Sequence, residues 1–318
     1  MKTFLRVSVS AIALLFAAAA SAPAAQLSTD ARTSIPHGVQ QLVTIDYHAM
    51  ENSNSAMNLK ERIMPPELKR FEEALHKSGL NENHDVEQLA FALFRGKSGD
   101  ERLDTVGIAQ GQFSVQEIVA NFRKQKLKPT LLRTNKIYPL AKTDMVVCFV
   151  DPSTMVFGDI GSVKRALDAR DGITPNLLSN GPMMDAMKSV EFEPLWSILD
   201  QKGTQIMMRQ VIGQAGSVSD YESIRKRLQA SWYSMDFQHG VKFNLTISTS
   251  DPFAAATLSS LLSAGLTVRK MSGSEAEKQA LSATSIASDG GRMSIHFSTT
   301  DAQFISLLQS PLFQGMVR

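Results

Sequence analysis

Residues 223–226 read Ser-Ile-Arg-Lys, and this spacing is the best candidate in the chain for covalent chemistry. On a helix it places the Lys226 amine one turn from the Ser223 hydroxyl, where the amine could accept the serine proton, as in penicillin-interacting enzymes. The partner motifs are missing, because Ser-Asp-Tyr at 219–221 lies upstream and no Lys-Thr-Gly occurs. A Ser-rich chain produces this spacing by chance, so we assign no catalytic residue.

A second candidate resembles the end of a phosphate-binding loop. Gly96, Lys97 and Ser98 have the closing spacing, but Phe91 stands where the opening glycine belongs, so the backbone cradle for phosphate is missing. No G-x-G-x-x-G pattern occurs either. We therefore predict a solvated charged turn here and no cofactor-binding residues.

The histidines and methionines are the candidate metal ligands. No two of the six histidines lie within five residues of each other, so the helical zinc spacings are absent; they are His37, His48, His76, His84, His239 and His296. The methionines do cluster, at Met183, Met184 and Met187 and again at Met207 and Met208. Thioethers suit Cu(I), but Met is also a flexible core filler. We assign no metal ligand and keep copper binding as an alternative.

Cys148 is the one cysteine of the chain, and it lies inside the apolar run Met-Val-Val-Cys-Phe-Val. A single cysteine cannot form an internal disulfide, so the core alone must stabilise the protein. A lone cysteine in an apolar strand behaves as a small buried hydrophobe. We expect Cys148 to be buried and unreactive.

The elements that would position any site are strands and helices in a mixed order. Strands are predicted at 42–47, 86–94, 105–110, 145–150 and 155–158, and a helix is predicted from Pro65-Pro66 with Leu68, Phe71 and Leu75 on one face. The clearest signal is strict alternation on both arms of a two-residue turn at His239-Gly240, which predicts a hairpin. Its buried side chains would be Tyr233, Met235, Phe237, Val241, Phe243, Leu245 and Ile247.

Strand-to-helix junctions recur in this sequence. Gly-Gln-Phe-Ser-Val-Gln-Glu at 111–117 is similar to Gly-Asp-Ile-Gly-Ser-Val-Lys at 158–164, and 247–258 is similar to 296–308. The fold class predicted is α+β, with two related halves of mostly antiparallel sheet and helices packed on one face. The boundaries are a signal peptide at 1–24, a disordered lead-in at 25–35, an N-terminal half at 36–180 and a C-terminal half at 181–318.

Residues 150–184 carry a family resemblance. A strand hairpin, a glycine, a short helix ending in Ala-Leu-Asp-Ala and a polar loop follow one another there. This pattern resembles a domain of unknown function in uncharacterised secreted bacterial proteins, and the likeness extends over about residues 36–195. The resemblance implies export and an α+β architecture, and it implies no activity or functional residue.

The first two dozen residues indicate the compartment. Lys2 and Arg6 precede an apolar run at 7–20, and Ala-x-Ala spacings follow at 20–22 and 22–24. This is the three-part pattern of a cleaved signal peptide, so we expect a periplasmic or secreted protein. Of 33 basic and 31 acidic residues in the chain, cleavage removes two basic ones and leaves no net charge. A neutral chain without a basic block does not favour nucleic acid, and no later apolar run is long enough for a transmembrane segment.

Three function classes remain after these exclusions. We favour a non-enzymatic exported binding or envelope-associated module whose partner in the envelope or outside the cell is unknown. The alternatives are an exported hydrolase whose site assembles from scattered Ser, His and acidic residues, and Met-based copper binding. Any recognition surface is expected on the polar side of the C-terminal sheet, which would present Asp236, Lys242, Asn244, Thr246 and His296.

Overall fold

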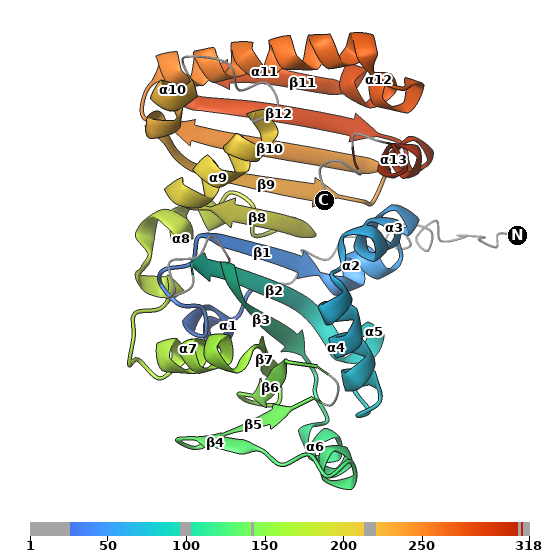
Figure 1. The fold of residues 1–318 in the computed structure, drawn as a ribbon, viewed down its shortest axis with the longest axis vertical. Coiled ribbons are helices and arrows are strands. Elements are labelled where there is room, and N and C mark those ends of the chain that lie inside the picture. Colours follow the sequence, from blue (N-terminus) through green and yellow to red (C-terminus); the bar gives the residue numbers. More distant parts are fainter. Residues whose placement is uncertain (1–25, 96–102, 141–142, 213–220, 311–312, 314–318) are drawn as a thin grey trace, which may run out of the picture.

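One antiparallel sheet forms the centre of the molecule. The computed structural model describes residues 26–95, 103–140, 143–212, 221–310 and 313. Twelve strands lie in the spatial order β11-β12-β10-β9-β8-β1-β2-β3-β7-β6-β5-β4 (Figure 1). In chain order they are β1 (Gln41–Asp46), β2 (Val86–Arg95), β3 (Leu103–Gly111), β4 (Thr130–Leu132), β5 (Asn135–Pro139), β6 (Val146–Phe149), β7 (Thr154–Gly158), β8 (Leu195–Leu199), β9 (Leu228–Asp236), β10 (Val241–Thr249), β11 (Thr284–Asp289) and β12 (Arg292–Thr299).

The helices are distributed along the whole chain. They are α1 (Thr29–Thr33), α2 (Tyr47–Glu51), α3 (Asn54–Ile63), α4 (Pro66–His76), α5 (Glu82–Asp85), α6 (Val115–Lys124), α7 (Ile160–Arg170), the 3-10 turn η1 (Leu177–Ser179), α8 (Gly181–Met187), α9 (Gln201–Ile212), α10 (Tyr221–Arg227), α11 (Pro252–Ser272), α12 (Glu275–Ser282) and α13 (Asp301–Leu308). Within the described residues, no helix combines the length and the apolar character that a membrane crossing needs.

The two faces of the sheet are covered differently. On one side, which we name the α7 face, α1 and α7 pack over the N-terminal strands and α8 packs over β8 and β9, in one large apolar cluster. On the other side, the α4 face, a cluster with α4 and α6 covers the N-terminal strands, and clusters with α2, α3, α9, α10, α11 and α13 continue along the C-terminal strands. The N-terminal strands and β8 are therefore covered on both sides, whereas helices cover β10, β11 and β12 on the α4 face.

The α+β class with antiparallel strands is confirmed, and the structure adds how the halves join. Strand β8 pairs with β1 on one side and with β9 on the other, so the strands form one sheet instead of two. All five residues of β8 are buried, because both faces of this strand are covered. Helices packed on one face describe β10, β11 and β12, while β8 and the N-terminal strands have helices on both faces. The boundary expected at 180/181 lies between η1 and α8 and stays a prediction.

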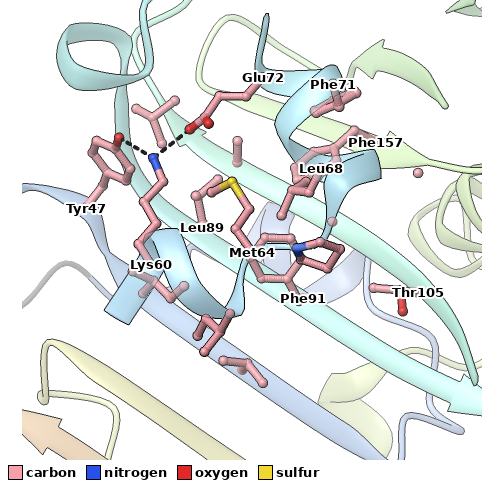
Figure 2. A pocket seen from close by; sticks show the side chains of 18 of the residues that line it. Tyr47, Lys60, Met64, Leu68, Phe71, Glu72, Leu89, Phe91, Thr105 and Phe157 are labelled. Atoms are coloured by element: carbon pink, nitrogen blue, oxygen red, sulfur yellow. Dashed lines mark hydrogen bonds and ion pairs between the residues drawn. The ribbon is translucent and has the colours of Figure 1, made fainter. Parts of the chain in front are cut away.

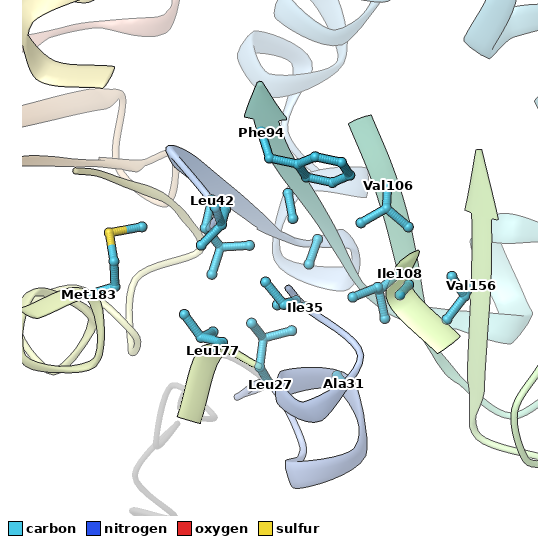
Figure 3. Close-up of a cluster of buried hydrophobic side chains, with 14 of the residues drawn as sticks. Leu27, Ala31, Ile35, Leu42, Phe94, Val106, Ile108, Val156, Leu177 and Met183 are labelled. Carbon is cyan, nitrogen blue, oxygen red and sulfur yellow. The ribbon is translucent and has the colours of Figure 1, made fainter. Parts of the chain in front are cut away.

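The segment before β1 corrects the expected disordered lead-in. Residues 29–33 form α1, whose N-cap Ser28 accepts a hydrogen bond from the Ala31 amide at 3.1 Å. Leu27, Ala31 and Ile35 are each at most 3 % exposed and belong to the cluster on the α7 face (Figure 3). The segment is ordered because its few apolar side chains enter a core formed elsewhere in the chain. The expected signal peptide at 1–24 lies outside the described residues.

The predicted C-terminal hairpin is confirmed. Strands β9 and β10 pair in register from Lys242 opposite Asp236 onward, which places the expected apolar set on the α4 face. The connection is longer than two residues, because Phe237 leaves the strand and packs edge-on against Phe304 at 6.4 Å. Gly240 closes the turn with a φ of +81°, and a Cβ atom there would lie 2.4 Å from the Thr299 oxygen.

Candidate functional site

A cavity of about 950 Å³ lies between the α4 face of the sheet and helices α2, α3 and α4. Figure 2 shows these helices above the strands, with side chains from both layers pointing into the space between them. Strands β1, β2, β3 and β7 form the floor. The apolar part of the wall includes Val43, Ile45, Leu89, Phe91, Leu93, Phe71, Leu75 and Phe157.

The floor strands are apolar on both faces, and their two faces differ in exposure. Leu42 and Ala90 point to the α7 face and are fully buried. Their neighbours Val43, Leu89 and Phe91 point to the α4 face and are only half-buried. Apolar side chains on both faces of a strand normally mean that both faces are covered by protein. On the α4 face the helices do not fill the space above these side chains, and the cavity lies in that space.

Gly107 in β3 shapes one wall of the cavity. A Cβ atom at this position would lie 2.2 Å from ring atoms of Phe157, so the ring lies directly across the glycine. In this position the Phe157 ring stacks on Phe71 at 4.7 Å and meets Phe91 edge-on at 5.9 Å. The missing side chain at residue 107 thus allows three aromatic rings to form a continuous apolar surface.

The roof is a pair of helices joined at Met64-Pro65. Pro66 begins α4 in the first turn, where the missing amide hydrogen costs no hydrogen bond. The predicted face of α4 is confirmed, since Phe71 and Leu75 are buried against the floor. Near the end of α3, Arg62 donates a hydrogen bond of 3.0 Å to the Leu308 backbone oxygen of α13, which fixes α3 to the C-terminal half.

A small polar cluster interrupts the apolar wall. The Lys60 ammonium donates to Glu72 Oε1 at 2.6 Å and to the Tyr47 hydroxyl at 3.0 Å (Figure 2). That hydroxyl in turn donates to the side-chain oxygen of Asn83 at 2.9 Å. Burial by itself lowers the pKa of Lys60, but the hydrogen bonds to Glu72 and Tyr47 outweigh burial, and the net pKa is raised above its ordinary value. The Lys60 ammonium is therefore charged, and Glu72 provides its counter-charge.

Comparisons with known proteins agree with this fold. No protein-family model matches the chain, and no curated protein matches it. The chain has a fold similar to that of TP0453. Crystal form I of TP0453 superposes with a TM-score of 0.51 and 12 % sequence identity over 89 % of this chain and 98 % of that one. Crystal form III gives a TM-score of 0.50 and 10 % identity over 87 % of this chain and 96 % of that one. At this identity the likeness shows the architecture.

The residues singled out by spacing do not meet at the cavity. Ser223 and Lys226 are exposed on α10, and the turn with Gly96 lies outside the described residues. Met183 and Met187 are buried in the cluster on the α7 face, whereas Met208 belongs to a cluster on the α4 face, so the two methionine groups do not converge. Across the described ranges, no group of three or more His, Cys, Asp and Glu side chains has a metal-binding arrangement.

The expected polar face of the C-terminal sheet is present. Lys242, Asn244 and His296 are exposed, and the His296 ring lies 2.8 Å from the Asn244 side-chain oxygen. Asp236 lies 3.8 Å from Lys242, its cross-strand neighbour. These contacts link the polar side chains to one another. A recognition role for this face stays a prediction.

The cavity and its polar cluster were missed by sequence reasoning. Spacing motifs point to side chains close in sequence, whereas Tyr47, Lys60 and Glu72 come from three separate helices. One usable signal was the run Leu89–Phe94, which is apolar at every position and therefore indicates a strand covered on both faces.

Cys148 is expected to resist labelling by thiol reagents in the folded protein at about pH 8. The side chain is 0 % exposed, and burial raises the pKa of its thiol to about 11, with Asp171 adding to the shift and Arg170 opposing it. Since the thiolate is the reactive form, labelling should be slow without denaturant and fast in urea. Because burial disfavours the Cys148 thiolate, the folded state keeps the thiol proton to a higher pH than the unfolded state. The free energy of unfolding should therefore be unaffected by this group below pH 9.0 and should fall as the pH rises toward about 11. Fast native labelling at pH 8 would contradict the expectation.

Proposed function

We propose that this chain is an exported, non-enzymatic binding protein that holds an apolar or amphiphilic small molecule between α2, α3, α4 and the sheet. The observation that carries the proposal is the cavity of about 950 Å³ with its predominantly apolar wall. Ligand sites in proteins are concave spaces of about 300–1,000 Å³, apolar over most of their surface with a few placed polar groups. The Lys60–Glu72–Tyr47 cluster fits the description of such polar groups.

Methionines support an adaptable apolar ligand. Five of them line the cavity, namely Met50, Met57, Met64, Met145 and Met155. Met side chains are unbranched and polarisable, so they repack around ligands of different shape and are common on surfaces that bind several partners. The wall is therefore suited to an alkyl chain better than to one rigid ring system.

The hydrolase alternative has less support from this site. Among the described residues that line the cavity, hydroxyl groups come from Tyr47 and Thr105, and no Ser, Cys or His is present. Hydrolysis by a covalent route needs a nucleophile with a general base within hydrogen-bond reach. The cavity wall offers groups that bind and orient a ligand.

The compartment is part of the proposal. A signal peptide at 1–24 would deliver the protein to the periplasm or the medium, where the binding module would exchange its ligand with a partner or surface of the envelope. N-terminal sequencing of exported protein should start after Ala22 or Ala24, and a start at Met1 would contradict export by this route.

Binding is tested with a fluorescent apolar probe. N-phenyl-1-naphthylamine is expected to bind the purified mature protein saturably, with one probe per chain and a dissociation constant of about micromolar order. Its fluorescence should rise on binding and fall when a long-chain alcohol is added as competitor. The absence of saturable binding by the folded protein would overturn the proposed function.

A further inference from the structure

Five charged side chains are among the residues that line the cavity: Glu51, Lys60, Glu72, Asp104 and Asp159. Two of them are engaged with α7. Asp104 accepts a hydrogen bond of 2.6 Å from Arg165, and Asp159 caps α7 by accepting from the amides of Gly161 and Ser162 at 2.8 and 3.0 Å. The charges that remain to meet a ligand are those of Glu51, Lys60 and Glu72.

These three charged side chains do not form a binding site for an anion. Lys60 is the cation of the described cavity wall, and Glu72 neutralises it at 2.6 Å. Glu51 lies 3.4 Å from Nδ1 of His48 and adds a second carboxylate. A ligand carboxylate placed here would lose its hydration and gain no unpaired cation in return, which is unfavourable in an apolar surrounding.

The same cluster is well arranged for a hydroxyl group. An ammonium has three N–H donors, and two of those on Lys60 are used by Glu72 and Tyr47. Glu72 accepts from Lys60 through Oε1, and its second oxygen is a further acceptor. A ligand hydroxyl can accept from the third N–H and donate to that oxygen, so both of its hydrogen-bonding functions find a partner.

From this geometry we propose that the ligand is an uncharged amphiphile with a hydroxyl-bearing head group, such as a long-chain alcohol or a monoacylglycerol, and that fatty-acid anions bind less well. The inference rests on the proposed function, because it names the ligand class of the same cavity. The alkyl chain lies along Leu89, Phe91 and Phe157, and the head group meets Lys60 and Glu72.

The test compares head groups at constant chain length. Tetradecanol, monomyristoylglycerol and tetradecanoate displace N-phenyl-1-naphthylamine from the mature protein at about pH 8, where the acid is ionised. The two uncharged compounds are expected to displace the probe at concentrations about tenfold lower than the acid. Equal or better displacement by tetradecanoate would overturn the head-group assignment while leaving the proposed function intact. If the probe itself does not bind, the proposed function fails, and the head-group inference fails with it.

Two variants of the cavity wall test whether the charges of Lys60 and Glu72 determine the head-group preference. Glu72→Gln keeps the size of the side chain and leaves Lys60 as an unpaired cation, so the affinity for tetradecanoate should rise about tenfold relative to that for tetradecanol. Lys60→Met removes the cation, so the affinity for tetradecanol should fall without a gain for the acid. Lys188→Met is the matched control, because Lys188 forms an exposed pair with Asp185 at 2.7 Å, and its head-group preference should equal that of the wild type. An unchanged preference in both cavity variants, with folding verified by circular dichroism, would overturn the inference.

Discussion

Replacement of Trp196 by Ala is expected to lower the free energy of unfolding by about 3–5 kcal/mol, as for other large-to-small changes at buried aromatic positions. Trp196 is 1 % exposed on β8 and belongs to the cluster on the α7 face. Its cross-strand neighbours are the small side chains of Thr44 and Ser234, which leave room for the indole. Truncation creates a cavity in the strand that joins the two halves of the sheet. Urea denaturation followed by far-UV circular dichroism measures the loss.

Trp232 provides the control, because it is the second tryptophan of the chain and lies on the neighbouring strand. It is only partly buried, and the Arg292 guanidinium lies over its ring at 5.6 Å. Trp232→Ala should therefore cost clearly less than Trp196→Ala. Similar losses of unfolding free energy for both variants would show that β8 is not packed as tightly as its burial indicates.

Local signals were sufficient for the C-terminal hairpin and for the start of the helix that follows it. The alternation around His239-Gly240 predicted β9, β10 and the face that each of them buries, because one face of this hairpin is apolar and the other polar. Asp251 followed by Pro252 has the composition of a helix start, and the Asp251 carboxylate caps α11 by accepting from the Ala254 amide at 2.9 Å. Each of these features depends on residues within a few positions of one another, so the sequence contains the information directly.

The site required information that local patterns do not contain. Helices α2 and α3 occupy 47–63, where apolar residues are sparse and no face stands out in the sequence. They are held by distant contacts, among them the hydrogen bond from Arg62 to α13. The short strand β8 was missed for the related reason that a five-residue segment with four apolar side chains is compatible with helix or strand. The cavity is formed by these elements together, so it could not be predicted before their packing was known.

Leu89→Trp is expected to reduce the affinity for the apolar probe at least about tenfold, equivalent to about 1.4 kcal/mol. Leu89 lies on the cavity floor on β2, half-buried, and points toward the roof helices (Figure 2). The larger indole fills space that the ligand would occupy. The fold should tolerate the change, because the added atoms enter the cavity and not the closely packed α7 face. Titration with N-phenyl-1-naphthylamine measures the affinity.

Leu131→Trp carries the same chemical change to a position away from the cavity. Leu131 is 66 % exposed on the edge strand β4, so its replacement should leave both probe affinity and stability at the wild-type level. A ligand held between α2, α3, α4 and the sheet predicts loss in the first variant and none in the second. Equal binding by both variants would place the probe elsewhere on the protein, and equal loss would point to a general effect of added tryptophan. The pair therefore tests the position of the ligand independently of its chemical identity.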